Sequence, residues 1–203
     1  GYQSWANSAL VQISLIDDGF NLHQMLENSF NFLAHFVMPD GSFSNGVGGR
    51  LTRFIFPAGH ELMAERIESA NDLSVFTRKY VNLSTFINLD TVDQTNLVPF
   101  FNDYAIAAAA MTKNMNLGYI RTSATKDKWN FEDAGIIGLS DKSKKMLVNT
   151  HRGGWVCISK KRARDRVVID QPLCRDSHNR LLMGCNGEIK SWSETEIIIV
   201  SDL

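Results

Sequence analysis

The chain has little of what usually marks a function at first sight. Among its 203 residues, 21 Lys and Arg balance 22 Asp and Glu, which leaves a formal net charge of −1. A charge this close to zero gives no general attraction to nucleic acid or to a membrane surface. Any polyanion would therefore have to be held by a local cationic patch.

Cysteine is scarce, and its three copies lie in the last quarter of the chain, at Cys157, Cys174 and Cys185. An odd number allows one disulfide with one thiol, or three thiols, so the redox compartment stays open. Cys174, His178 and Cys185 offer three metal ligands, but structural zinc sites use paired C-x2-C knuckles, which are absent here. The sequence predicts neither a metal nor a cofactor.

Long apolar runs, internal repeats and nucleotide-binding motifs are missing as well. The most apolar run, YAIAAAAM at 104–111, is far shorter than the ~20 residues that cross a bilayer. Without a Walker loop, a dinucleotide fingerprint or a G-x-S-x-G elbow, nucleotide chemistry and serine hydrolysis lack support. The start has neither an initiator methionine nor a signal-peptide pattern, as expected of a chain that begins inside a longer protein. We expect a soluble protein with no membrane partner.

The first half of the chain has the apolar periodicity of helices. Segment 4–17 carries Trp5, Leu10, Ile13 and either Leu15 or Ile16 at spacings that predict one packed side. Pro39-Asp40-Gly41 predicts a turn after the second segment. The expected helices cover 4–17, 21–38, 57–72, 73–89 and 97–115.

After about residue 118 the pattern changes to short runs rich in β-branched residues, separated by turn signals. Asn186-Gly187 between two such runs predicts a hairpin. The expected strands cover 119–124, 134–139, 144–150, 154–161, 166–170, 180–184, 187–192 and 194–202. The fold class is therefore α+β, with a helical region at 1–117 and an antiparallel β region at 118–203.

Two stretches carry a family resemblance. PDGSFSNGVGGR at 39–50, followed by a second cation at Arg53, resembles a sugar-facing loop of the (α/α) toroid in heparinase II/III-like proteins and related polysaccharide lyases. NFEDAGIIGL at 130–139 with KKMLVNTHRGG at 144–154 is similar to the start of their β-sandwich. The resemblance implies a partial toroid followed by a β-sandwich, β-elimination at a uronate of an acidic polysaccharide, and a periplasmic or secreted location.

The chain departs from that family at two points. Where the family has a His-Gly-His or His-x-Asp setting, the sequence reads Asn149-Thr150-His151-Arg152, and no Asn-Asn-His stretch is present. Either those residues precede residue 1 in a fuller chain, or the elimination chemistry has been lost.

The lyase interpretation gives each candidate catalytic residue a role. Such an enzyme must neutralise a carboxylate, abstract the proton at C5 and protonate the leaving oxygen. Asn45 is suited to neutralising the acid, and His60 or Tyr2 to acting as the base. The alternatives are that the glycine-rich loop is an ordinary connector and that His60 is a packed or surface residue.

The expected substrate-binding residues are aromatic or cationic. Trp5 would stack on a sugar ring, and Arg50 and Arg53 would meet carboxylate or sulfate groups. His151 and Arg152 precede Gly153-Gly154, so we expect them at a turn between strands, facing a groove between the two regions. The alternatives are that the aromatic rings lie in the core, that the arginines pair with nearby acids, and that the hairpin tip is merely solvated.

The most highly charged local stretch is the basic run KKRARDR at 160–166. No aromatic residue lies within this run, so nucleic-acid binding is not expected. A solvated loop is the first interpretation, and weak binding to an anionic polysaccharide is the second. Two other functions stay open for the whole chain. One is a carbohydrate-binding module without catalysis. The other is a structural fragment that needs an upstream domain or a second copy to cover its helices.

Overall fold

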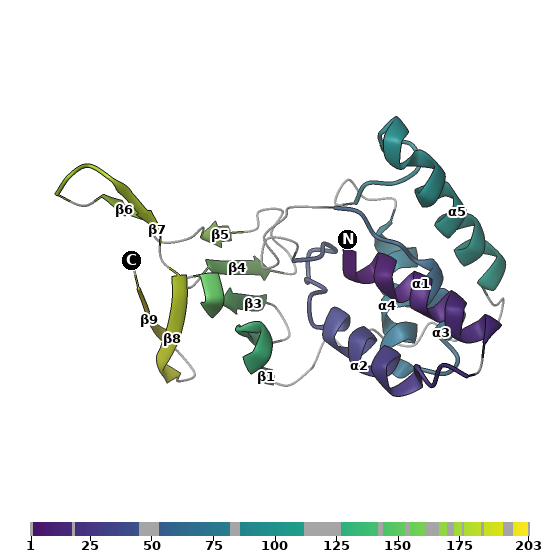
Figure 1. Cartoon of the computed structure of the whole chain (residues 1–203), viewed down its shortest axis with the longest axis horizontal. Coiled ribbons are helices and arrows are strands. Elements are labelled where there is room, and N and C mark those ends of the chain that lie inside the picture. The colour runs from purple at the N-terminus through teal and green to yellow at the C-terminus, as the bar shows by residue number, and fades with distance from the viewer. Residues whose placement is uncertain are drawn as a thin grey trace. The chain divides into compact units, whose positions relative to one another are not determined.

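The computed structural model describes residues 2–17, 19–44, 53–81, 86–111, 127–141, 144–152, 155–160, 167–169, 173–175, 177–183, 185–192 and 197–202. The chain divides into two compact units, whose main boundary follows Arg121. The helical unit holds the first part of the chain, and the β unit holds the sheet residues (Figure 1). Helices precede strands, so the expected α+β class is confirmed.

The helical unit is built around a short central helix. Its described residues form α1 (Tyr2–Ile16), α2 (His23–Ala34), α3 (Ala58–Met63), α4 (Glu68–Tyr80) and α5 (Gln94–Ala110). Helix α3 contacts α1, α4 and α5, while α2 packs against α1 and α4 (Figure 1). Fully buried apolar side chains from several helices fill the core between them, including Val11, Leu26, Phe30, Leu73 and Phe76.

The packed side of α1 is not the one that the sequence predicts. The buried residues are Ser4, Asn7, Ser8 and Val11, whereas Ile16 is 86% exposed. Small polar side chains form this contact because they approach the backbone of the segment that leads into α3 and hydrogen-bond to it. Trp5, Ile13 and Ile16 of the predicted apolar stripe therefore lie on the outward side, while Leu10 packs against the core.

Segment 57–72, expected as one helix, is broken. After α3 the chain turns at Ala64, and Ile67 adopts an extended conformation before α4 begins. Ile67 is only 3% exposed, so the break places an apolar side chain in the core. Helix α4 then runs from the end of the expected helix 57–72 into the expected helix 73–89, and it ends at Tyr80.

The turn at Pro39-Asp40-Gly41 is confirmed. Val37 and Phe43 form an antiparallel bridge across it, and Gly41 has a φ of 85°, which a residue without a Cβ adopts readily. Helix α2 ends at Ala34, several residues before the proline. This turn places Ser44 next to Phe36, whose carbonyl accepts a hydrogen bond from the Ser44 N–H at 2.9 Å.

The β unit contains one five-stranded antiparallel sheet with strands in chain order. Its strands are β1 (Asp127–Phe131), β2 (Ile136–Ser140), β3 (Lys144–Asn149), β4 (Trp155–Lys160) and β5 (Val167–Ile169). Two further pairs consist of β6 (Leu173–Arg175) with β7 (Leu181–Met183), and β8 (Cys185–Trp192) with β9 (Ile197–Asp202). The expected strand at 119–124 lies outside the described residues.

The hairpin expected at Asn186-Gly187 is wrong. Both residues lie inside β8, where the pairing with β9 shifts between Cys185 and Glu188. A glycine inside a strand commonly marks such a bulge, because it has no side chain to pack and tolerates the altered backbone. The described turn in this region is instead at Ser177 and His178, between β6 and β7.

Candidate functional site

The glycine-rich loop is described only at its ends. Asn45 and Arg50 lie outside the described residues, and Arg53 is the first residue after that gap. Arg53 is exposed, and its carbonyl oxygen accepts a hydrogen bond from the Ile87 N–H at 3.1 Å. Phe54 forms a parallel bridge with Ile87. The backbone that carries Arg53 is therefore fixed to the segment before α5.

Tyr2 and Trp5 both lie on the outward side of α1. They are 60% and 49% exposed, which excludes the alternative that they belong to the core. The Trp5 ring stacks on Phe56, with ring centroids 5.6 Å apart and an interplanar angle of 20°. The Phe56 N–H donates a hydrogen bond to Ser4 Oγ at 3.1 Å. Trp5 is thus a partly exposed ring supported by an inner aromatic ring.

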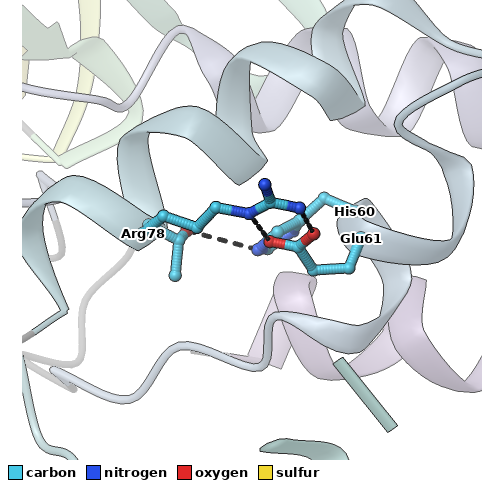
Figure 2. A network of polar contacts seen from close by, with 4 residues as sticks. His60, Glu61 and Arg78 are labelled. Carbon is cyan, nitrogen blue, oxygen red and sulfur yellow. Dashed lines mark hydrogen bonds and ion pairs between the residues drawn. The ribbon is translucent and has the colours of Figure 1, made fainter. Parts of the chain in front are cut away.

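His60 lies at the centre of the helical unit, where Figure 2 shows it beside Glu61 and Arg78. Its side chain has no exposed surface, and its Nε2 lies 3.3 Å from Thr77 Oγ1 on α4. The Phe30 ring contacts the imidazole edge to face, with centroids 6.4 Å apart. Burial lowers the pKa of His60 to about 3, because the charged imidazolium is poorly solvated there.

This position corrects the expectation that His60 acts as the base. A proton shuttle needs contact with the substrate and a pKa near the working pH, and His60 has neither. The side chain sits on the inner side of α3, because the helix has neighbours on several sides and five of its six residues are buried.

An ion pair between α3 and α4 lies next to His60 (Figure 2). The Arg78 guanidinium donates from Nε to Glu61 Oε1 at 2.9 Å and from its terminal nitrogen to Glu61 Oε2. This hydrogen bonding raises the pKa of Arg78. The Glu61 side chain is 3% exposed and that of Arg78 is 17% exposed, so the pair fixes one helix against the other.

A second buried polar cluster holds the N-terminus of α3. Asp103 on α5 accepts a hydrogen bond from the Ala58 N–H at 3.0 Å, and Ser8 Oγ accepts one from the Gly59 N–H at 2.9 Å. Burial raises the pKa of the Asp103 carboxyl group. These side chains satisfy N–H groups that a helix leaves without intrahelical partners. The cluster explains why α1 buries serine where an apolar residue was expected.

His151 and Arg152 lie in the β unit, in a short 3-10 turn (Thr150–Arg152) between β3 and β4. Asn149 pairs with Trp155, so the two strands on either side of this turn are antiparallel neighbours. His151 is exposed, while the side chain of Arg152 lies outside the described part. Thr150 connects the turn to the residue before β2, because its N–H donates to the Gly135 carbonyl oxygen at 2.7 Å.

The β unit also contains an amine in an unusual setting. Lys145 on β3 places its Nζ 5.0 Å from the centre of the Trp129 ring on β1. Burial lowers the pKa of Lys145 to about 7, against a smaller opposing effect from the Asp127 carboxylate. Trp129 lies over Gly138, where any side chain would overlap its ring. No sequence pattern predicts this contact, because it depends on strand register.

A small hollow of about 190 Å³ opens on the helical unit near the start of α2. Its lining includes His23, Asn21 and Arg66, with Phe20 beside them. The hollow is well below the ~300 Å³ at which pockets for small molecules begin. His23 begins α2, whereas His35 caps its C-terminal end, so the two histidines lie at opposite ends of the helix.

The remaining sequence candidates give no cluster. Residues 161–166 of the basic run lie outside the described residues, and Lys160 ends β4. Within the part of the chain that the structure describes, no three His, Cys, Asp or Glu side chains are grouped so that they could hold a metal ion.

Compared with protein-family models, curated proteins and solved structures, the chain matches none of them.

Proposed function

We propose that the helical unit binds an acidic polysaccharide at a platform formed by Tyr2, Trp5 and Arg53, without cleaving it. The observation that carries this proposal is the half-exposed Trp5 ring stacked on Phe56. Flat aromatic rings bind the C–H faces of sugars, while their polar edges hydrogen-bond to hydroxyl groups or water. We call these three residues the aromatic platform.

Two features connect the platform to an acidic ligand. Arg53 lies only three residues before Phe56, on the segment that supports Trp5. A guanidinium can pair with a uronate carboxylate or a sulfate through two hydrogen bonds. Helix α1 itself contains no Asp or Glu that would repel such a group.

Burial of His60 favours binding over catalysis. Among the two candidate bases, Tyr2 is the exposed one. Its exposure beside Trp5 supports the second candidate function, β-elimination at a uronate with Tyr2 as the base. In that case the chain would share with heparinase II/III-like lyases their activity as well as the partial toroid and β-sandwich that the resemblance implies.

Titration calorimetry with a uronate polymer and with its carboxyl-reduced, neutral form tests the proposal. We expect the chain to bind the acidic form, and Trp5→Ala to weaken binding at least tenfold because the stacking surface is lost. Ile13→Ala is the matched control, since Ile13 is 43% exposed on the same helix but lies away from Phe56. Equal binding by Trp5→Ala and the parent chain would reject the platform.

The same samples distinguish binding from cleavage. β-Elimination creates an unsaturated uronate that absorbs in the ultraviolet, so a steady rise in absorbance that Tyr2→Phe abolishes would establish the lyase. We expect no rise in ultraviolet absorbance. We also expect Tyr2→Phe to bind the uronate polymer as tightly as the parent chain, because the ring that contacts the sugar is retained.

A further inference from the structure

Four polar side chains form a row across one side of the five-stranded sheet in the β unit. They come from four neighbouring strands, β1 to β4. Asp127 pairs with Ser140, Ser140 pairs with Lys145, and Lys145 pairs with Ser159. Residues directly opposite each other in an antiparallel sheet project from the same side, so these four side chains are neighbours. We call these four residues the polar row.

Exposure increases from one end of the polar row to the other. Ser159 is 1% exposed, and its hydroxyl group has no hydrogen-bond partner among the described residues. Lys145 and Ser140 are half-buried. Asp127 is exposed, and it lies on β1, an edge strand of this sheet. Lys145 therefore lies between the covered middle of the sheet and its open edge.

An aromatic ring covers the sheet on the open side of Lys145. The Lys145 Nζ lies 5.0 Å from the centre of the Trp129 ring on β1. Trp129 pairs with Gly138, and its ring occupies the space that a side chain at Gly138 would need. The ring therefore shields part of the amine from water, while the exposed Asp127 marks the side from which a small molecule can approach.

The neighbours of Lys145 in the polar row provide little charge to hold a proton on the amine. Ser140 and Ser159 flank it and are uncharged, and Asp127 lies two strands away. Burial lowers the pKa of Lys145 to about 7, and the Asp127 carboxylate opposes this effect only in part. At pH 7 about half of the Lys145 amines are neutral and nucleophilic, against roughly one in 2,500 for an ordinary lysine.

We propose that Lys145 is a covalent binding site for small aldehydes, which it holds as an imine beside Trp129. The neutral amine nitrogen attacks the carbonyl carbon and gives a carbinolamine. The carbonyl oxygen then leaves as water with the two hydrogens of the amine, and the C=N bond forms, so no oxidant or reductant is needed. This site lies in the β unit and does not depend on the aromatic platform of the helical unit.

The surroundings of Lys145 favour an aldehyde over an acyl donor. A protonated imine keeps its positive charge where the ammonium group was, so the Trp129 ring and the Asp127 carboxylate continue to stabilise it. An amide formed from an acyl donor is neutral and would lose both interactions. Because Lys145 is half-buried, the aldehyde must also be small enough to reach the amine from the sheet edge.

Reductive trapping on the full chain tests this site. Pyridoxal and cyanoborohydride are added at pH 7, and the modified lysines are located by peptide mass spectrometry. Lys144 is the internal control, because it is the next residue on β3, projects from the opposite side of the sheet, and has a side chain that is 62% exposed. We expect Lys145 to react at least tenfold faster than Lys144, although Lys145 is less exposed. In urea the two lysines should react at equal rates.

The ratio of the two rates should also depend on pH. It should fall between pH 7 and pH 10, because Lys144 gains neutral amine over this range while Lys145 already has it. Asp127→Asn, a change at an exposed edge position, should raise the ratio at pH 6, since the carboxylate that favours the ammonium form is gone. Equal rates in the folded chain, a ratio that does not change with pH, or no rise at pH 6 in Asp127→Asn would each overturn the proposal.

Discussion

Glu61 and Arg78 form an ion pair at the contact between α3 and α4, with side chains only 3% and 17% exposed. They are separated by 17 positions in the sequence, and no periodicity relates them. Sequence patterns therefore could not predict the pair. It forms because the helices on which the two residues lie pack together.

Removing one partner of this pair should be costly. Arg78→Met leaves the Glu61 carboxylate buried without its guanidinium, and we expect a loss of about 3 kcal/mol in the free energy of unfolding by urea. The double variant with Glu61→Gln should recover most of that loss, because the uncompensated charge is gone. A double variant as unstable as Arg78→Met would show that the charge is not the cause.

His60 should make the helical unit sensitive to acid. In the folded chain its pKa is about 3, whereas the unfolded chain takes up this proton near the ordinary value of 6.5. Between these values the unfolded state binds more protons, so stability is complete above pH 6.5 and falls as the pH is lowered toward 3. Urea unfolding at several pH values measures this dependence.

The matched variant for that experiment is His60→Gln, which keeps a polar group within reach of Thr77 but does not titrate. Its stability should depend less steeply on pH between 6.5 and 3. Asp103 titrates with the opposite sign, because its pKa is raised, but it is present in both chains and cancels in the comparison. Identical slopes would contradict the burial of a neutral His60.

At the scale of elements, the sequence predicted well wherever a local signal acts alone. The α+β order, the helices α1, α2 and α5 and the turn at Pro39-Asp40-Gly41 follow from periodicity and turn residues, whereas the break between α3 and α4 does not. Asn186-Gly187 misled because the same dipeptide suits both a hairpin turn and a bulge inside a strand. Only the pairing of β8 with β9 decides between them.

The orientation of α1 shows the other limit. Its apolar residues predicted the packed side, but the small polar Ser4 and Ser8 face the core because they hydrogen-bond to the backbone before and within α3. Trp5 was expected on the packed side, whereas it is half exposed on the outward side, and its contact with a sugar stays a prediction. A hydrophobic pattern cannot distinguish a core-facing side from an outward binding surface.

The contact between α1 and α3 should tolerate no added side-chain atom at Gly59. A Cβ there would lie 2.8 Å from the Ser8 backbone nitrogen, which cannot move independently of α1. We expect Gly59→Ala to lower the unfolding free energy by about 1–3 kcal/mol. Gly19→Ala is the control, because its nearest neighbour is the movable Asp17 side chain; an equal loss in both variants would argue against the α1–α3 contact.

At the scale of the whole molecule, the proposed sugar-binding surface belongs to one of the two compact units. The aromatic platform draws on α1 and on the segment at 53–56, and both lie in the helical unit. The sequence alone could not join these two segments, because the contact between Trp5 and Phe56 depends on how the helical unit packs.

The aromatic platform is tested most directly by following the indole N–H signals of the four tryptophans by NMR while a uronate oligosaccharide is added. Trp5→Phe identifies the Trp5 signal by its disappearance. We predict that this signal shifts in a saturable way and that the Trp129 signal, from the β unit, stays in place. A stationary Trp5 signal during binding, or a shift confined to Trp129, would contradict the platform.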